Sequence, residues 1–391
     1  MFKPKLIVAL AAALALSIPA AQAQEHVKVG LIATLSGPPA VLGTQMRNGF
    51  MLAVKTLGGK LGGLPADIYV ADDGLKPDVA VGKAKELVER DKVNFVVGPI
   101  FSNILGAIMK PVTGAGVILI SPNAGSSAFA GKECNKNFFV TSYQNDQVHE
   151  VLGQYAQDSG IKKVIIVVPN YQAGKDAAAG FKHTFHGQIL DEIYVPLGQL
   201  DYSAEISRIA AAKPDAIFAL IPGGMGVNFV KQFRQSGLAD KIKFLSAFTV
   251  DESTLPAQRD AALGMLGGAN WTPNLDNPQN KAFVAAYEKA YGGAIPATYA
   301  FQAYDAAMLI DSAVRLVKGN LSDKAALRAA LKKADFVSLR GKFKFNNNHY
   351  PIQDFYLDKV AKRPDGKYET EIVKKVFTDY ADSYAKDCPM K

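Results

Sequence analysis

The stretch from Val117 to Gly125, "VILISPNAG", carries the pattern on which the fold depends. An apolar, β-branched run ends at Ser-Pro and is followed only by Asn, Ala and Gly. Such a run predicts a buried strand, and the small residues after it leave the main chain accessible at the strand end. Ligands of parallel α/β sheets bind at these carboxyl ends. An ordinary strand-to-loop turn explains this stretch equally well on its own.

Similar apolar strands recur on both sides of this stretch, and each is followed by a helical pattern. The strands expected before it cover 27–33, 66–72 and 93–99, and those after it cover 162–170, 188–197, 214–222 and 242–248. Repeated strand–helix units predict a parallel sheet with helices on both faces. Because there are two series, we expect two α/β lobes, followed by a mostly helical segment from about 273 and a β-rich tail over 341–360.

The first 23 residues have the pattern of a secretory signal peptide. Lys3 and Lys5 precede an apolar run, which ends before the small-residue site at Ala21 and Ala23. The run is shorter than the roughly 20 residues that a membrane span needs, which disfavours the alternative of an N-terminal anchor. We therefore expect cleavage after Ala23 and an exported protein.

Composition supports a globular, two-domain chain. It has 391 residues, of which 49% are hydrophobic and 20% charged, and a formal charge of +8. The basic residues are scattered among acidic ones, which indicates solvated helix faces rather than a nucleic-acid surface. The two cysteines, Cys134 and Cys388, allow one disulfide in an oxidising compartment, and two unpaired thiols are the alternative.

Several segments together resemble the type I periplasmic solute-binding proteins of ABC transporters, the Leu/Ile/Val-binding class. They are "VGLIATLSGPPAVLGTQMRNGFMLAV", "VNFVVGPIFSNILGAIMKPVTGAGVILISPNAG", "VIIVVPNYQAGKDAAAGF" and "DAIFALIPGGMGVNFVKQFRQSGL". The segments "ISPNAG", "NDQVHE" and "PGGMGVNF" are more similar to the branch whose ligands are aromatic acids. The resemblance implies an α/β fold of two Rossmann-like lobes with parallel sheets, joined by a three-crossover hinge that lets them close on a ligand.

The resemblance also implies lobe boundaries. The N-terminal lobe would hold 24–142 and 273–345, and the C-terminal lobe 143–272 and 346–375. Residues 376–391 would form a tail that returns to the N-terminal lobe. The expected location is the periplasm, and the expected partners are a small carboxylate or amino acid and the permease subunits of an inner-membrane ABC transporter. We expect a monomer that binds no nucleic acid.

The pocket implied by the resemblance lies at the strand ends between the lobes. Its candidate ligand-binding residues are Leu42, Ser102, Asn123, Ala124, Gly125, Tyr171, Ala173, Pro222, Gly223, Met225, Phe248 and Trp271. Ser102 and the main chain of 123–125 would bind a carboxylate.

Phe248 departs from the pattern of the amino-acid binders, which need an acid at this strand end for the ligand ammonium. A phenyl ring cannot pair with an ammonium but can pack on an aromatic ligand. The sequence therefore favours an aromatic carboxylate, benzoate-like or hydroxycinnamate-like, over a branched-chain amino acid. Asp251 and Glu252 lie close by, and a shift of a few residues would return an acid to the cleft and favour the amino acid.

No catalytic or metal-binding pattern is found in the sequence. It contains no Gly-x-Ser-x-Gly elbow and no Walker loop. His183 and His186 share a helix face without a third ligand nearby, which is typical of a solvated helix. Ser102 as a nucleophile would need a base, and no histidine is expected at a strand end lining the cleft. We therefore expect a binding protein without cofactor or metal rather than an exported enzyme.

Overall fold

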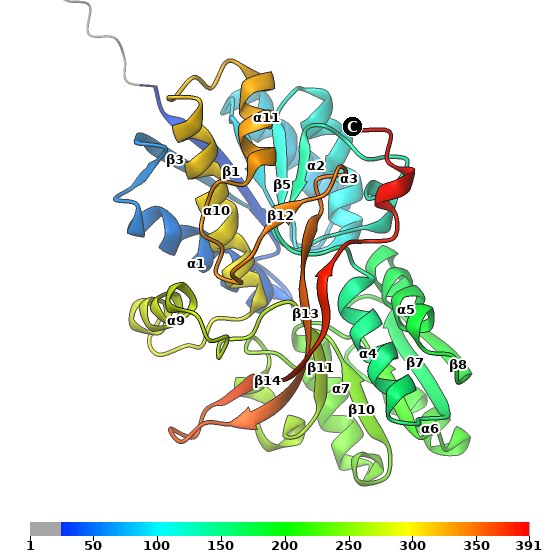
Figure 1. The fold of residues 1–391 in the computed structure, drawn as a ribbon. Coiled ribbons are helices and arrows are strands. Elements are labelled where there is room, and N and C mark those ends of the chain that lie inside the picture. The colour runs from blue at the N-terminus through cyan, green and yellow to red at the C-terminus, as the bar shows by residue number, and fades with distance from the viewer. Residues whose placement is uncertain (1–24, 391) are drawn as a thin grey trace, which may run out of the picture.

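The computed structural model describes residues 25–390, so the expected signal peptide and its cleavage site lie outside the described residues. Two β-sheets, each flanked by helices, form the upper and lower halves of the molecule in Figure 1. Within residues 25–390, no helix combines the length and the apolar character needed to cross a membrane.

The first lobe is built on a six-stranded sheet with the order β2-β3-β1-β4-β5-β6. Its strands are β1 (Val27–Ala33), β2 (Lys60–Leu61), β3 (Leu64–Asp72), β4 (Phe95–Val97), β5 (Ile118–Ser121) and β6 (Phe138–Val140). Its helices are α1 (Ala40–Thr56), α2 (Pro77–Lys85), which a π-helical turn extends to Arg90, and α3 (Ser102–Gly114). All strands pair in parallel except β2, so the carboxyl ends of β1, β4 and β5 meet at one edge.

The second lobe is built on an eight-stranded sheet in which β7, β8, β9, β10 and β11 pair in parallel. These strands are β7 (Lys163–Pro169), β8 (Gln188–Val195), β9 (Ala216–Ala219), β10 (Lys243–Ser246) and β11 (Leu266–Ala269). The helices are α4 (Gln147–Asp158), α5 (Gln172–Thr184), α6 (Ser203–Ala212), α7 (Gly224–Gln235) and α8 (Leu255–Gln258). The antiparallel strands β12 (Lys344–Phe345), β13 (Pro351–Lys362) and β14 (Tyr368–Tyr380) complete the sheet beside β11.

The chain passes between the two lobes three times. The first passage lies between β6 and α4, and the second follows β11. Helices α9 (Pro278–Ala290), α10 (Thr298–Leu316) and α11 (Lys324–Lys333) then pack on the first lobe, where α10 lies against α1. The third passage runs from α11 through the short strand β12 into β13, which with β14 extends between the halves in Figure 1.

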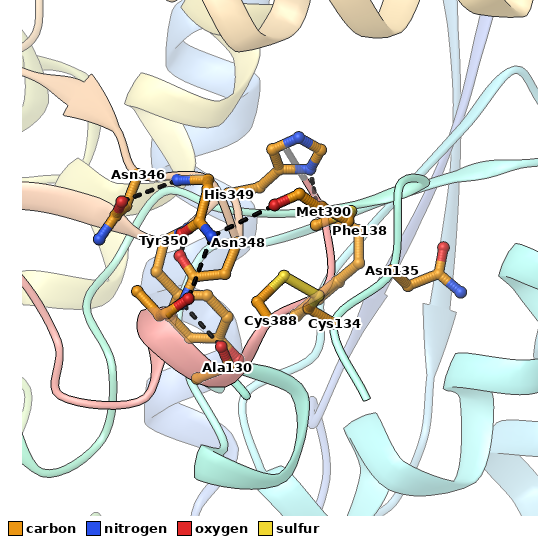
Figure 2. Close-up of a disulfide and its surroundings, with 12 residues drawn as sticks. Ala130, Cys134, Asn135, Phe138, Asn346, Asn348, His349, Tyr350, Cys388 and Met390 are labelled. Carbon is orange, nitrogen blue, oxygen red and sulfur yellow. Dashed lines mark hydrogen bonds between the residues drawn. A yellow bond between two sulfur atoms is a disulfide. The ribbon is translucent and has the colours of Figure 1, made fainter. Parts of the chain in front are cut away.

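A disulfide between Cys134 and Cys388 fixes the C-terminal segment to the first lobe (Figure 2). Asn348 supports the same region, because its side-chain amide donates to the carbonyl of Ala130 at 2.8 Å and to Asp382. In a loop-closure model, a bridge across 254 residues lowers the entropy of the unfolded chain and stabilises the fold by up to about 5 kcal/mol.

Candidate functional site

A cavity of about 420 Å³, counting the part that opens to solvent, lies between the facing strand ends of the two lobes. Its lining residues are Leu42, Ile100, Phe101, Ser102, Asn123, Ala124, Tyr143, Asn145, His149, Tyr171, Ala173, Leu220, Pro222, Phe248 and Tyr299. They come from the ends of parallel strands in both sheets, from the first passage between the lobes and from the start of α10. Neither lobe therefore holds the cavity alone.

One end of the cavity is suited to an anion. Helix α3 begins at Ser102, which is 4% exposed. The N–H groups of a helix's first turn have no acceptor within the helix and carry partial positive charge. The Ser102 Oγ accepts a hydrogen bond from Asn145 Nδ2 at 3.1 Å, which leaves its own proton free to donate to a ligand.

Asn145 connects this end to both lobes. Its Nδ2 also donates to Asp176 Oδ2 at 2.8 Å, and its Oδ1 accepts from the Gly125 N–H at 3.0 Å. The Gly125 N–H is thus already used, and Gly125 is not among the lining residues. The sequence predicted that this N–H would bind the ligand, because no local pattern indicates that the side chain of Asn145 lies next to Gly125.

The other walls of the cavity are aromatic. The rings of Tyr143 and Phe248 are stacked with centroids 5.3 Å apart and planes inclined by 14°. Tyr299 lies 6.3 Å from Phe248 on another side, and Tyr171 packs on Phe101 at 6.0 Å. Phe248 has a φ of 64°, a left-handed conformation that costs a residue with a side chain roughly 1–2 kcal/mol. The surrounding structure therefore holds this ring in place at some cost.

The cavity is electrically neutral apart from the helix end. No lining residue within 25–390 carries an acidic side chain. Burial raises the pKa of Tyr143, Tyr171 and Tyr299, so these phenols stay protonated. Burial also lowers the pKa of His149 to about 3, which keeps its imidazole uncharged at neutral pH.

Asp251 and Glu252, the acids that sequence reasoning left open, do not line the cavity. Asp251 Oδ1 accepts hydrogen bonds from the N–H and hydroxyl of Ser253. Glu252 Oε1 accepts from the N–H and hydroxyl of Thr370, each at 2.7 Å. Phe248, not an acid, is the residue of this segment that reaches the cavity.

Three other candidates lie outside the cavity lining. Met225 is 1% exposed in the core of the second lobe, where its sulfur accepts from the Gly198 N–H. Trp271 stacks on Phe301 with centroids 4.6 Å apart. Its indole N–H donates to an amide oxygen of α9, within the helical part of the first lobe. Gly223 lies where the two lobes touch.

The contact at Gly223 explains the "PGGMG" loop. Gly223 has a φ of 66°, and a Cβ there would lie 3.0 Å from Pro39 Cα. The N–H of Gly224 donates to Pro38 O at 3.1 Å, across from the loop after β1. The glycines therefore allow the two backbones to approach each other, which is a role in the contact between lobes.

A second contact between the lobes lies beside Asn145. Ser127 Oγ, in the loop after β5, donates to Asp176 Oδ1 on α5 at 2.6 Å. Gln172 also donates to this carboxylate at 2.7 Å. The chain Ser102–Asn145–Asp176–Ser127 links the anion-binding end of the cavity to the surface where the lobes meet.

Sequence reasoning missed seven lining residues, which are Ile100, Phe101, Tyr143, Asn145, His149, Leu220 and Tyr299. Tyr143, Asn145 and His149 lie on the segment "SYQNDQVHE", of which "NDQVHE" was compared with the aromatic-acid branch without naming a ligand-binding residue. Its polar and aromatic composition directly after a buried strand was the available signal. His149 comes from the first turn of α4, whereas histidines were sought only at strand ends.

Within residues 25–390, no group of three or more His, Cys, Asp or Glu side chains could hold a metal ion. The geometry of the cavity suits a small, flat, apolar body with an anionic group at one end.

The model of the family described as periplasmic binding protein matches residues 26–367. The chain therefore belongs to the periplasmic binding protein family. It is 31% identical over 373 residues to the Leu/Ile/Val-binding protein homolog 6 of Brucella melitensis biotype 1, covering 92% of this chain and 94% of that protein.

Solved structures share the fold over nearly their whole length. An ABC transporter solute-binding protein from R. palustris, in complex with benzoate, has a TM-score of 0.88 and 30% identity, covering 94% of this chain and 100% of that one. Another, from Rhodopseudomonas palustris BisB5 in complex with 3,4-dihydroxybenzoic acid, has a TM-score of 0.86 and 33% identity, covering 92% and 99%. The predicted fold class, an α/β periplasmic binding protein of type I with two lobes, is confirmed.

Proposed function

We propose that this protein is the periplasmic substrate-binding component of an ABC importer and that it binds a small aromatic carboxylate, benzoate-like or hydroxycinnamate-like. The observation that carries the proposal is the neutral, aromatic cavity, lined by Phe248, with the first turn of α3 at Ser102 at one end. The benzoate and dihydroxybenzoate complexes of the related proteins support it.

The alternative ligand, a branched-chain amino acid, would bring an ammonium group into this cavity. An ammonium buried without a partner is costly. Asp251, which follows β10, lies outside the cavity lining; its Oδ1 accepts from the N–H of Ser253, and burial raises the pKa of Asp251 to about 6. The cavity thus offers hydrogen-bond donors for a carboxylate, but no negatively charged side chain lines it to pair with an ammonium.

The proposed mechanism is closure of two lobes over the ligand. We assign 24–142 and 273–345 to the N-terminal lobe and 143–272 and 346–375 to the C-terminal lobe, with the remaining tail on the former. The ligand carboxylate accepts hydrogen bonds from Ser102 and the start of α3, and its ring packs on Phe248. The closed protein, exported to the periplasm and monomeric, then delivers the ligand to the permease without changing it chemically.

A thermal-shift screen of aromatic carboxylates against amino acids, followed by calorimetry, tests the proposal. A ligand at a hundred times its Kd adds roughly 2.7 kcal/mol to the stability of the protein. Benzoate or a derivative should raise the melting temperature, and leucine, isoleucine and valine should not. The reverse pattern would contradict the proposal and favour the amino-acid binder.

Two variants locate the site. Ser102→Ala removes one charge-assisted hydrogen bond and should weaken binding of the carboxylate by roughly ten- to hundredfold. Ser207→Ala makes the same change on the exposed face of α6 and should leave the affinity unchanged. Equal affinities for the two variants would show that the carboxylate lies elsewhere.

A further inference from the structure

His149 lines the cavity and has a buried ring nitrogen without a partner. The residue is 2% exposed, and its ring is among the groups that line the cavity. Its Nδ1 has no hydrogen-bond partner among the described residues. Since a buried polar atom without a partner is costly, such an atom requires an explanation.

The position of the His149 ring is well defined. It meets Phe218 edge to face with centroids 5.4 Å apart and meets Phe248 in the same manner at 6.3 Å. Phe248 is the ring on which we expect the ligand to pack. His149 therefore lies beside the ring that we expect the ligand to contact, within reach of a substituent on the ligand.

The charge of His149 restricts what it can bind. Desolvation lowers its pKa to about 3, so the imidazole is neutral, with one nitrogen that donates and one that accepts. A hydroxyl group also donates and accepts, and it is uncharged. A second carboxylate on the ligand would instead need a cation, and no lining residue within 25–390 is a lysine or arginine.

We propose that His149 binds a hydroxyl group on the ring of the ligand and thereby makes the cavity selective for hydroxylated aromatic acids over their unsubstituted parents. This inference rests on the proposed function, because it takes the ligand to be an aromatic carboxylate. The rest of the ligand is accounted for by Ser102 and the start of α3 at the carboxylate and by Tyr143 and Phe248 at the ring.

Calorimetry with benzoate, 3-hydroxybenzoate and 4-hydroxybenzoate tests the inference. The wild-type protein should bind at least one hydroxybenzoate more tightly than benzoate. His149→Phe keeps a flat ring but removes both nitrogens. It should weaken binding of that hydroxybenzoate roughly tenfold or more and change the Kd of benzoate less than about threefold.

Two conservative variants and one control complete the design. His149→Asn and His149→Gln return an amide near the positions of Nδ1 and Nε2, and at least one of them should retain the preference for the hydroxylated acid. They decide the matter if His149→Phe does not fold. His186→Phe, on the exposed surface after α5, should leave all three affinities unchanged.

Two results would overturn the role of His149. One is an equal loss of affinity for benzoate and hydroxybenzoate in His149→Phe, which would indicate a packing role or a contact with the carboxylate. The other is an unchanged preference for the hydroxylated acid in that variant. A wild-type protein that binds none of the three acids would instead contradict the proposed function.

Discussion

Replacing Gly224 by alanine tests whether the ligand-bound form of the protein has the contact between the lobes that the structure shows at Pro38 and Gly224. The alanine Cβ would lie 2.7 Å from Pro38 O, closer than a Cβ atom approaches a backbone oxygen. To relieve this contact the lobes must separate, which also lengthens the 3.1 Å hydrogen bond from Gly224 N to Pro38 O. Overpacking of this size costs about 1–3 kcal/mol, and a hydrogen bond contributes about 1 kcal/mol.

The cost should fall on the closed form alone, because Pro38 and Gly224 belong to different lobes. A penalty of about 2 kcal/mol on closure weakens the observed Kd roughly thirtyfold, since affinity scales with the population of the binding-competent form. The melting temperature of the ligand-free protein should hardly change, because alanine is favourable in a helix. Gly106→Ala on α3 is the matched control, because a Cβ there meets no atom within 4 Å.

Calorimetry measures the Kd of the preferred aromatic acid for both variants, and small-angle scattering measures the radius of gyration with and without it. Gly106→Ala should match the wild type in both measurements. Gly224→Ala should need a higher ligand concentration to reach the compact form. If Gly224→Ala binds with wild-type affinity, the contact at Pro38 is no part of the ligand-bound state and the closure argument fails.

Three further predictions concern the cavity, the disulfide and the buried acids. Phe248→Glu should abolish binding of aromatic acids in calorimetry, because it places a carboxylate beside an anionic ligand in a dry cavity; binding at wild-type affinity would remove Phe248 from the site. When the protein is made in an oxidising compartment, intact-mass analysis after alkylation should detect no free thiol. The double variant Cys134→Ser/Cys388→Ser should lower the free energy of unfolding by up to about 5 kcal/mol. An unchanged melting temperature of the double variant would contradict this prediction. Burial raises the pKa of Glu252 to about 8, so its contribution to stability is present below its ordinary pKa of about 4.5 and is lost as the pH rises through 8. The melting temperature of Glu252→Gln relative to wild type should therefore increase between pH 5 and pH 9, and a constant difference would show that Glu252 ionises normally.

The sequence predicted the scaffold well because its signals are local. Alternating apolar strands and amphipathic helices define both sheets, and β1 begins and ends where the pattern placed it, at Val27 and Ala33. The strand expected over 66–72 begins earlier, at Leu64, and the β-rich tail expected over 341–360 continues through the hairpin of β13 and β14 to Tyr380. Small shifts of this kind are expected, because the ends of elements depend on contacts that are distant in the sequence.

The sequence predicted those cavity-lining residues that lie at or near strand ends and missed most of the others. Eight of the twelve candidate ligand-binding residues line the cavity, and they are Leu42, Ser102, Asn123, Ala124, Tyr171, Ala173, Pro222 and Phe248. Tyr299 was missed because a tyrosine in a mostly apolar helix has the pattern of a core residue. Trp271 lies away from the cavity, and its indole N–H donates to Asn280 on α9. No local sequence pattern indicates this hydrogen bond.

Asn145 lines the cavity and also bonds to a residue of the contact between the lobes, which gives a physical reason for coupling between binding and closure. Asn145 holds Ser102 on the anion-binding side and Asp176 on the other, and Asp176 accepts from Ser127 across the gap between the lobes. When the lobes separate, Asp176 loses Ser127, a charge-assisted partner. A ligand that contacts residues of both lobes makes more contacts in the closed form than in the open one. It therefore binds the closed form more tightly, and this difference in affinity increases the population of the closed form. On the proposed function the ligand needs no charged partner for this, because neutral donors and a helix end would bind its carboxylate.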